Sequence, residues 1–442
     1  MPRDRQQDRQ ILALAVPALA TLVAEPLFLL ADSAIVGHLG ALPLAGLGIA
    51  AAILATAVGL CVFLAYGTTA AVARRLGAGD LRDGLRLGVD GMWLALGLGA
   101  AMWAATALAA PELVRVLGAS EAVAPYAVSY LRWSLPGVPA MLVVLAATGV
   151  LRGLQDTRTP LVVAVVAAVA NVALNWLLVY PLGMGIAGSG LGTSLAQLGM
   201  ALALGSVVVR AARLHGAPLR PDRAGIITAA RDGVPLIVRS LAMRAVLLTV
   251  AAVAATLGDT QLAGHQIVFT LWIFTSFVLD ALAIAGQALT GRFLGAGDVA
   301  GARAATRRMV QWGIGFGALV GLLMLLAAPW VGALFSPDEA VQQVIAAALV
   351  PAAISQPLSG YVFVLDGVLI GAGDGRYLGL VSVLNLVTFL PLAGAVLWLG
   401  PEGTPGLVWL WTAFAFGFMG ARTLTLWARQ RSDAWLVTGS TR

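Results

Sequence analysis

The chain has 442 residues, of which 60% are hydrophobic and 11% are charged, and its mean hydropathy is +0.91. A soluble globular chain carries roughly a quarter charged residues, so this composition excludes a soluble protein. A net charge of +6 could indicate nucleic-acid binding, but the positions of the arginines, described below, argue against it. Because each helical crossing of a bilayer needs roughly 20 apolar residues, the length allows about twelve crossings.

Apolar runs broken by Gly, Pro and charged residues predict twelve transmembrane helices. In chain order the expected spans are 11–36, 44–69, 88–108, 126–148, 160–180, 187–209, 228–254, 262–290, 308–330, 342–368, 378–399 and 405–428. The first span is too long for a cleaved signal peptide. An open sheet cannot satisfy its backbone in lipid, and the chain lacks the alternating pattern of a barrel. The predicted fold class is an all-α integral membrane protein.

The arginines, which are the only basic residues apart from three histidines, predict the orientation of the spans. Most of them lie at the N-terminus, in alternate loops or at the C-terminal end. Those that lie in spans or in the sparsely basic loops are Arg115, Arg132, Arg239 and Arg244. By the positive-inside rule both termini face the cytoplasm. We therefore expect a multi-pass protein of the plasma membrane with both termini cytoplasmic.

An offset of 218 residues aligns the two halves of the chain without a gap over most of their length. It pairs Pro17 with Pro235, Arg74 with Arg292, and LGAGD at 76–80 with LGAGD at 294–298. We predict an N-terminal six-helix lobe (1–209), a cytoplasmic linker (210–231) and a C-terminal six-helix lobe (232–442). Since each copy has an even number of spans, the repeats are parallel, with the substrate between them.

Acidic side chains at membrane depth are costly and are candidate functional residues. The first span holds Glu25 and Asp32, which lie seven residues apart on roughly one helical face, and Pro17 and Pro26, which can bend the helix. A carboxyl group in a dry cavity favours its neutral form, whereas water or a cation favours the ionised form. An acid beside a bendable helix is thus a candidate proton or sodium switch. The alternative is a protonated Asp that only hydrogen-bonds a neighbouring helix.

The fifth and sixth predicted spans offer neutral polar partners for such an acid. Asn171 and Asn175 are four residues apart and share a helical face, and Thr193 follows a glycine-rich stretch. Their oxygen atoms suit a sodium ion or a hydrogen bond to a protonated Asp. Small polar residues also serve simply to pack membrane helices together, so both interpretations stay open.

The second half contains a different set of polar residues at membrane depth. An intramembrane arginine such as Arg239 needs a carboxylate, and Asp280 and Asp366 are available. A buried ion pair that only locks three helices together is an equal alternative to a functional role. The residues at the equivalent positions of the first half are Thr21, Val62 and Thr148. The buried polar sets are therefore not duplicated with the scaffold.

The chain lacks the residues that a membrane-embedded enzyme or a nucleotide-driven pump needs. It has one cysteine, three scattered histidines and no GxxxxGK[ST] loop. We expect no catalytic residues and no cofactor beyond a coupling proton or sodium ion, and no metal site except a possible sodium ion at Asp32. The expected partners are a small organic substrate and membrane lipids, without nucleic acid, and the expected state is a monomer. A membrane scaffold, or an enzyme without a recognisable catalytic site, is the alternative of a different class.

Five segments carry a resemblance to a known family. They are DSAIVGHLG at 32–40, LRGLQDTRTP at 151–160, AGHQI at 263–267, VLDALAIAGQALTGRFLGAGD at 278–298 and FVLDGVLIGAGD at 363–374. Together they resemble the multidrug and toxic compound extrusion (MATE) family, in particular its DinF-like branch, over essentially the whole chain. The resemblance implies a V-shaped pair of six-helix bundles that open alternately to the two sides. It also implies export of organic, often cationic, compounds in exchange for protons or sodium.

The resemblance further implies that the N-terminal lobe binds the coupling ion through Asp32, Asn171, Asn175 and Thr193. Relatives often carry a second Asp where Asn175 stands. Because an Asn side chain cannot change its charge, this departure argues against a two-carboxylate sodium site and favours proton coupling at Asp32, or a weaker sodium site. A sibling branch has a functional acid in span ten, so Asp366 is a secondary candidate, together with Glu25, Pro26, Arg239 and Asp280. A lipid-linked precursor flippase of the same superfamily is the alternative transporter.

Overall fold

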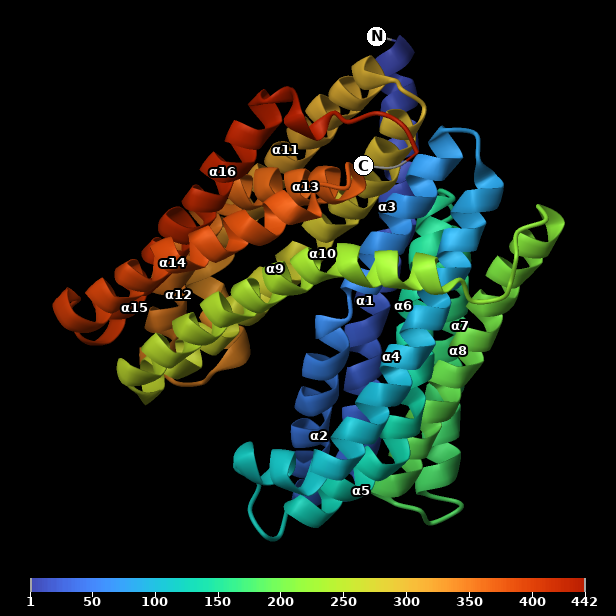
Figure 1. Cartoon of the computed structure of the whole chain (residues 1–442). Coiled ribbons are helices and arrows are strands. Elements are labelled where there is room, and N and C mark those ends of the chain that lie inside the picture. Colours follow the sequence, from blue (N-terminus) through green and yellow to red (C-terminus); the bar gives the residue numbers. More distant parts are fainter. Residues whose placement is uncertain (1, 441–442) are drawn as a thin grey trace. The chain divides into compact units, whose positions relative to one another are not determined.

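The structure is a computed structural model that describes residues 2–440, without the side chains of residues 2–6 and Glu25. Every regular element in this part of the chain is a helix (Figure 1). Among the described residues, eleven helices are long and apolar enough to cross a membrane, or twelve if one bent pair of helices forms a single span. The prediction of an all-α membrane protein is confirmed.

The chain divides into two compact units. The first, here called the N-lobe, comprises Val16–Gly233. The second, here called the C-lobe, comprises Val234–Thr438 together with the helical residues up to Ala15.

The N-lobe contains the first eight α-helices of the described chain. They are α1 (Pro2–Gly37), whose first residues belong to the C-lobe, α2 (Ala41–Leu60), α3 (Phe63–Gly77), α4 (Leu81–Val116), α5 (Ala124–Ser134), α6 (Val138–Gly153), α7 (Arg158–Val179) and α8 (Ile186–Leu214). Two predicted spans, 44–69 and 126–148, are each interrupted. In the second, a 3-10 turn at Leu135–Gly137 separates α5 from α6, where Pro136 cannot donate a helical hydrogen bond.

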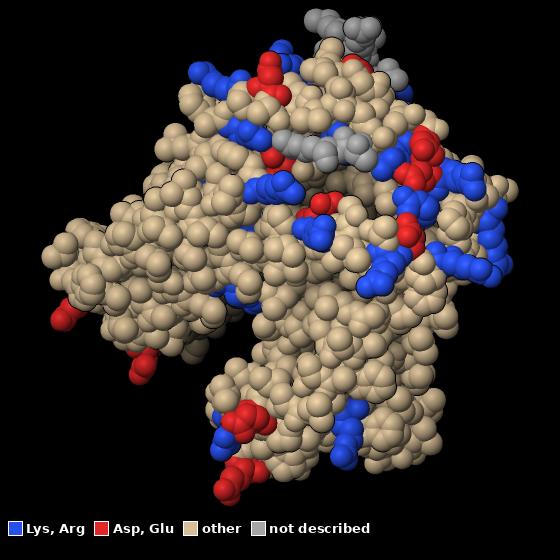
Figure 2. All heavy atoms as spheres, in the orientation of Figure 1, with Lys and Arg blue, Asp and Glu red and all other residues tan. Residues whose placement is uncertain are grey.

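Side-chain hydroxyls link neighbouring helices of the N-lobe. On α3, Thr68 Oγ1 lies 3.2 Å from the Ala146 carbonyl oxygen, and Thr69 Oγ1 lies 3.0 Å from the Gly149 carbonyl oxygen, both on α6. Charged side chains gather at the ends of the N-lobe helices, and the surface between them is mainly uncharged (Figure 2). An apolar surface in contact with lipid accounts for large exposed hydrophobic residues such as Val166 and Leu202.

The C-lobe contains the second set of helices. They are α9 (Arg223–Thr256), α10 (Asp259–Gly295), α11 (Val299–Phe335), α12 (Glu339–Ile354), α13 (Gln356–Gly371), α14 (Gly375–Leu399), α15 (Gly403–Thr412) and α16 (Met419–Arg431). The predicted span 342–368 is bent by 51° between α12 and α13. The predicted span 405–428 contains a π-helical segment, Ala413–Phe418, between α15 and α16.

Two helices, α1 and α9, each belong to both units. Along the chain, α1 passes from the C-lobe to the N-lobe between Ala15 and Val16, and α9 passes from the N-lobe to the C-lobe between Gly233 and Val234. The two crossing points are 218 residues apart, which is the offset of the sequence repeat. The duplication therefore extends to the places where the chain changes units.

Candidate functional site

Asp32 of α1 is buried in the N-lobe, with 1% of its surface exposed. Three neutral groups donate hydrogen bonds to its carboxyl group. Tyr130 Oη lies 3.1 Å from Oδ2, Asn175 Nδ2 lies 2.9 Å from Oδ1, and the Ser189 hydroxyl also donates to Oδ1. Both oxygens are thus provided with donors, which a carboxylate removed from water requires.

The other two predicted residues reach Asp32 indirectly. Asn175 Nδ2 lies 3.2 Å from Asn171 Oδ1, so Asn171 orients the amide that contacts Asp32. Thr193 Oγ1 lies 3.4 Å from Tyr130 Oη. Asn171 and Asn175 are fully buried, and Thr193 is 4% exposed. The structure therefore brings the four predicted residues together: Asn175 contacts the Asp32 carboxyl group directly, and Asn171 and Thr193 reach it through a neighbour.

The predicted set lacked two residues that contact Asp32 directly, Tyr130 of α5 and Ser189 of α8. Ser189 lies four residues before Thr193 and so shares its helical face, a spacing that could have identified it. Tyr130 carried no comparable signal. The glycine-rich stretch before Thr193 has a specific role here, because a Cβ at Gly192 would overlap Asn175 Oδ1. Glycine at that position lets α8 approach α7 closely enough to complete the site.

An apolar groove of about 790 Å³ lies between α1 and α7, beside the Asp32 site. On α1 it is lined by Leu27, Phe28 and Ala31, and the last of these precedes Asp32 directly. On α7 it is lined by six apolar residues, Ala168, Val169, Val172, Ala173, Trp176 and Leu177. The helices that supply Asp32 and Asn175 to the polar site therefore also form the walls of a groove suited to an apolar molecule.

Asp366 of α13 is another buried carboxyl group, and it has charged partners. Arg239 Nη2 of α9 lies 2.7 Å from Asp366 Oδ2, and Arg422 of α16 forms an ion pair with the same oxygen. Asp280 lies within electrostatic reach of Arg422. Arg239 and Asp366 thus meet in a buried ion pair that joins three helices, whereas Arg244 is exposed.

Arg422 was grouped with the basic residues of the C-terminal end, and that assignment is wrong. It lies inside α16 and is only 4% exposed. Its position inside the predicted span 405–428 was the signal that could have identified it as an intramembrane arginine needing a carboxylate.

The remaining secondary candidates are Pro26 and Glu25. Pro26 lies within α1, which stays helical from Pro2 to Gly37. The side chain of Glu25 lies outside the part of the chain that the structure describes. Among the described residues, no group of three or more His, Cys, Asp or Glu could hold a metal ion.

Comparison with known proteins identifies the family. The MatE family model matches residues 17–177 and 235–393, so one match falls on each half and the second begins 218 residues after the first. DNA damage-inducible protein F of Escherichia coli (strain K12) is 28% identical over 444 residues, covering 97% of this chain and 94% of that protein. The probable multidrug resistance protein NorM of Pseudomonas syringae pv. tomato is 31% identical over 437 residues, covering 94% and 93%.

Solved structures share the fold. The crystal structure of the Vibrio cholerae MATE transporter VcmN in its bent form has a TM-score of 0.86 and 22% identity, and covers 98% of this chain and 100% of that one. With the family model matched in both halves, this chain is a multi-pass membrane protein and belongs to the MATE family of multidrug and toxic compound efflux transporters, with DinF-like relatives.

Proposed function

We propose that this protein is a proton-coupled antiporter that exports apolar, often cationic, organic molecules by alternating access. We further propose that it is a monomer in the plasma membrane with both termini in the cytoplasm, which the distribution of its arginines supports. One observation carries the coupling proposal. Asp32 is a buried carboxyl group whose hydrogen-bond partners are all neutral in the described part of the chain. Such a group can change its charge without breaking an ion pair.

The hydrogen-bond pattern distinguishes the two oxygens of Asp32. Oδ1 faces the Asn175 amide, which can only donate, so a proton on this oxygen would lose that bond. Oδ2 faces the Tyr130 hydroxyl, which can donate or accept. When Oδ2 is protonated it can donate to Tyr130 Oη, and Tyr130 can then donate to Thr193 Oγ1. The site can therefore accept a proton by rotating hydroxyl groups, without moving its helices first.

Protonation removes the charge that the three donors stabilise, and it weakens their hold on α1. Hydrogen bonds to a charged group stabilise by roughly 1.5–3 kcal/mol each, about twice as much as bonds to a neutral group. Once that hold is weakened, α1 is free to bend at Pro26, which lacks the helical donor. Because Leu27, Phe28 and Ala31 line one wall of the groove, such a bend reshapes it and expels its occupant.

The same geometry favours a proton over a sodium ion. A hard cation needs several oxygen atoms with free lone pairs. In this site Oδ1 of Asp32 already accepts from Asn175 and Ser189. Asn171 Oδ1 accepts from the Asn175 amide as well. A sodium ion would have to displace these donors and would meet a single carboxylate in return.

The test is transport by the purified full-length chain in proteoliposomes, with pH and sodium gradients imposed separately. A cationic dye serves as the substrate and dye-stimulated ion flux as the readout. We expect the pH gradient to drive transport, and we expect Asp32→Asn to reduce it to the level of empty vesicles while the protein stays folded. Undiminished pH-driven transport by Asp32→Asn would refute the mechanism. Transport driven by sodium at constant pH would refute the choice of ion.

A further inference from the structure

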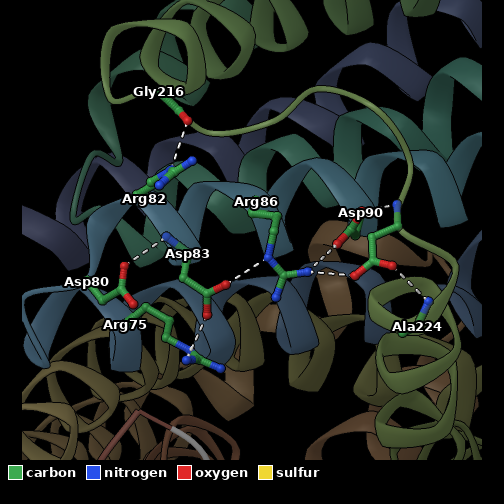
Figure 3. A network of polar contacts seen from close by, with 9 residues as sticks. Arg75, Asp80, Arg82, Asp83, Arg86, Asp90, Gly216 and Ala224 are labelled. Carbon is green, nitrogen blue, oxygen red and sulfur yellow. Dashed lines mark hydrogen bonds and ion pairs between the residues drawn. The ribbon is translucent and has the colours of Figure 1, made fainter.

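The segment that leads into α9 is held by side chains of α4, within the N-lobe. Arg82 Nε lies 2.9 Å from the Gly216 carbonyl oxygen, and Trp93 Nε1 lies 3.0 Å from the Leu219 carbonyl oxygen. The backbone N–H of Asp222, directly before α9, donates to Asp90 Oδ1 at 2.9 Å. We call Arg82, Arg86, Asp90 and Trp93 the N-lobe clamp, and Figure 3 shows the network that contains Arg82, Arg86 and Asp90.

Asp90 is the centre of the N-lobe clamp. It is fully buried, and Arg86 Nη1 lies 3.3 Å from Asp90 Oδ2 and 3.0 Å from Asp222 Oδ2. A Cβ at Gly225 in the first turn of α9 would overlap the Asp90 carboxyl group. The start of α9 is therefore fixed to α4 by a backbone hydrogen bond, a shared guanidinium and close packing.

The equivalent position of the C-lobe holds the start of α1. The repeat offset of 218 places Arg308 of α11 at the position of Asp90. Arg308 binds Asp8 through two contacts of 2.7 Å, from Nε to Oδ1 and from Nη2 to Oδ2. Trp312 Nε1 adds a third at 2.9 Å from Asp8 Oδ1. We call Arg308 and Trp312 the C-lobe clamp. The two clamps therefore have residues of opposite charge, Asp90 and Arg308, at equivalent positions of the repeat.

Each clamped helix changes units shortly after its clamped end. In α9, Gly233 packs against the Phe63 ring of α3 in the N-lobe, whereas Pro235 packs against Gly379 of α14 in the C-lobe. In α1 the change falls at the equivalent residues, between Ala15 and Val16, one residue before Pro17. A proline inside a helix removes one helical hydrogen bond and is a common site of bending. Both helices are thus held at one end and weakened where they change units.

We propose that Asp90 and Arg308, which occupy equivalent positions of the repeat, are positioning residues of the transport cycle. They hold the starts of α9 and α1 on their lobes, so that relative motion of the two units is concentrated at the hinges Pro17 and Pro235. Without the clamps, the starts of α1 and α9 would detach from their lobes. The two units could then move without bending α1 and without reshaping the apolar groove beside Asp32. Both hinges lie inside helices, at prolines, which are common sites of helix bending. The proposal rests on the alternating access of the proposed function.

A charge exchange across the C-lobe clamp tests this role in the full-length chain. Asp8→Arg and Arg308→Asp each place like charges together, and we expect each to lower pH-driven dye transport about tenfold, a coupling of ordinary size. The double exchange restores the pair, and we expect it to recover most of the rate. Arg308→Lys keeps the charge but loses the two-point contact, and it should give an intermediate rate. Asp90→Asn keeps an acceptor for Asp222 N–H and should give a smaller loss.

A matched control lies on the same helix. Arg303 of α11 forms an ion pair with Asp433, which belongs to the same lobe and to no crossing helix. Arg303→Ala should leave transport unchanged. A loss of rate equal to that of Arg308→Asp would show that any ion pair on α11 matters, and it would overturn the proposal.

A distance measurement separates this proposal from the proposed function. With the single Cys61 replaced by Ser, spin labels at Leu108→Cys (87% exposed, N-lobe) and Trp398→Cys (85% exposed, C-lobe) report the separation of the lobes. We expect Arg308→Asp to broaden the distance distribution and the double exchange to narrow it again, whether or not protons drive transport. An unchanged distribution in folded Arg308→Asp, or a double exchange that stays broad, would overturn the role of the clamp.

Discussion

Asp32 of the N-lobe and Asp366 of the C-lobe are both buried aspartates, and the two have opposite surroundings. Asp32 in the N-lobe accepts from a tyrosine, an asparagine and a serine. Asp366 in the C-lobe accepts from two guanidinium groups. A carboxylate between two arginines is held ionised by its partners, because neutralising it would leave two buried cations. A carboxylate among neutral donors can take either charge, which is what a coupling site needs.

The two lobes share the helices of the repeat but differ at the positions of these two aspartates. The residue equivalent to Asp32 in the C-lobe is Val250, and the residue equivalent to Asp366 in the N-lobe is Thr148, both buried. Each lobe thus keeps the helical scaffold of the repeat and places its charge at a position that is uncharged in the other. The two lobes share the helical scaffold, but each of these two buried aspartates occurs in one lobe only.

The largest effect that distinguishes the two aspartates should be on stability. Asp366→Asn leaves Arg239 and Arg422 without their shared carboxylate, and breaking a buried ion pair costs about 3–5 kcal/mol. Asp32→Asn keeps an oxygen for two of its donors and should cost about 1 kcal/mol or less. Thermal unfolding of the two variants in the same detergent measures the difference.

A control for this comparison removes both ion pairs of Asp366. Replacing Arg239 and Arg422 by Met and Asp366 by Leu leaves no unpaired charge among these three residues, and should recover most of the stability that Asp366→Asn loses. Equal melting temperatures for Asp32→Asn and Asp366→Asn would contradict the contrast between the two sites.

Most of the fold was predictable because each crossing of a bilayer demands a long apolar run. The interruptions were not predictable, since the π-helical segment Ala413–Phe418 and the bend between α12 and α13 keep the apolar composition of their spans. In the site, Asn175 and Thr193 were identifiable as polar groups that a buried acid needs. Ser189 was missed because serine between two glycines resembles a packing position. Arg422 was missed because it lies close to the basic C-terminal end.

A smaller effect should separate the direct partners of Asp32 from the indirect ones. Ser189→Ala removes a donor that stabilises the ionised carboxylate more strongly than the neutral carboxyl group, so the carboxyl group stays protonated to a higher pH. We expect the pH of half-maximal dye transport to rise by about one unit, which corresponds to about 1.4 kcal/mol, the size of one hydrogen bond to a charged group. Thr193→Ala acts only through Tyr130 and should shift the profile less. A larger shift in Thr193→Ala than in Ser189→Ala would contradict the arrangement of donors around Asp32.

The smallest expected effect concerns the choice of ion. Asn175→Asp places a second carboxyl group against Asp32 and removes the amide that donates to Oδ1. Two carboxylates with the Asn171 amide oxygen offer a cation the lone pairs that the native site directs toward donors. We expect a sodium gradient at constant pH to begin to drive dye transport in this variant. Thr148→Asp, which adds a carboxyl group at the N-lobe position equivalent to Asp366, is the control for added charge and should give no sodium response. If Asn175→Asp responds to sodium no more than the native chain does, the donors around Asp32 do not determine which ion is coupled. The contrast between Asp32 and Asp366 would then explain why Asp32 can bind a proton, but not why the site selects protons over sodium ions.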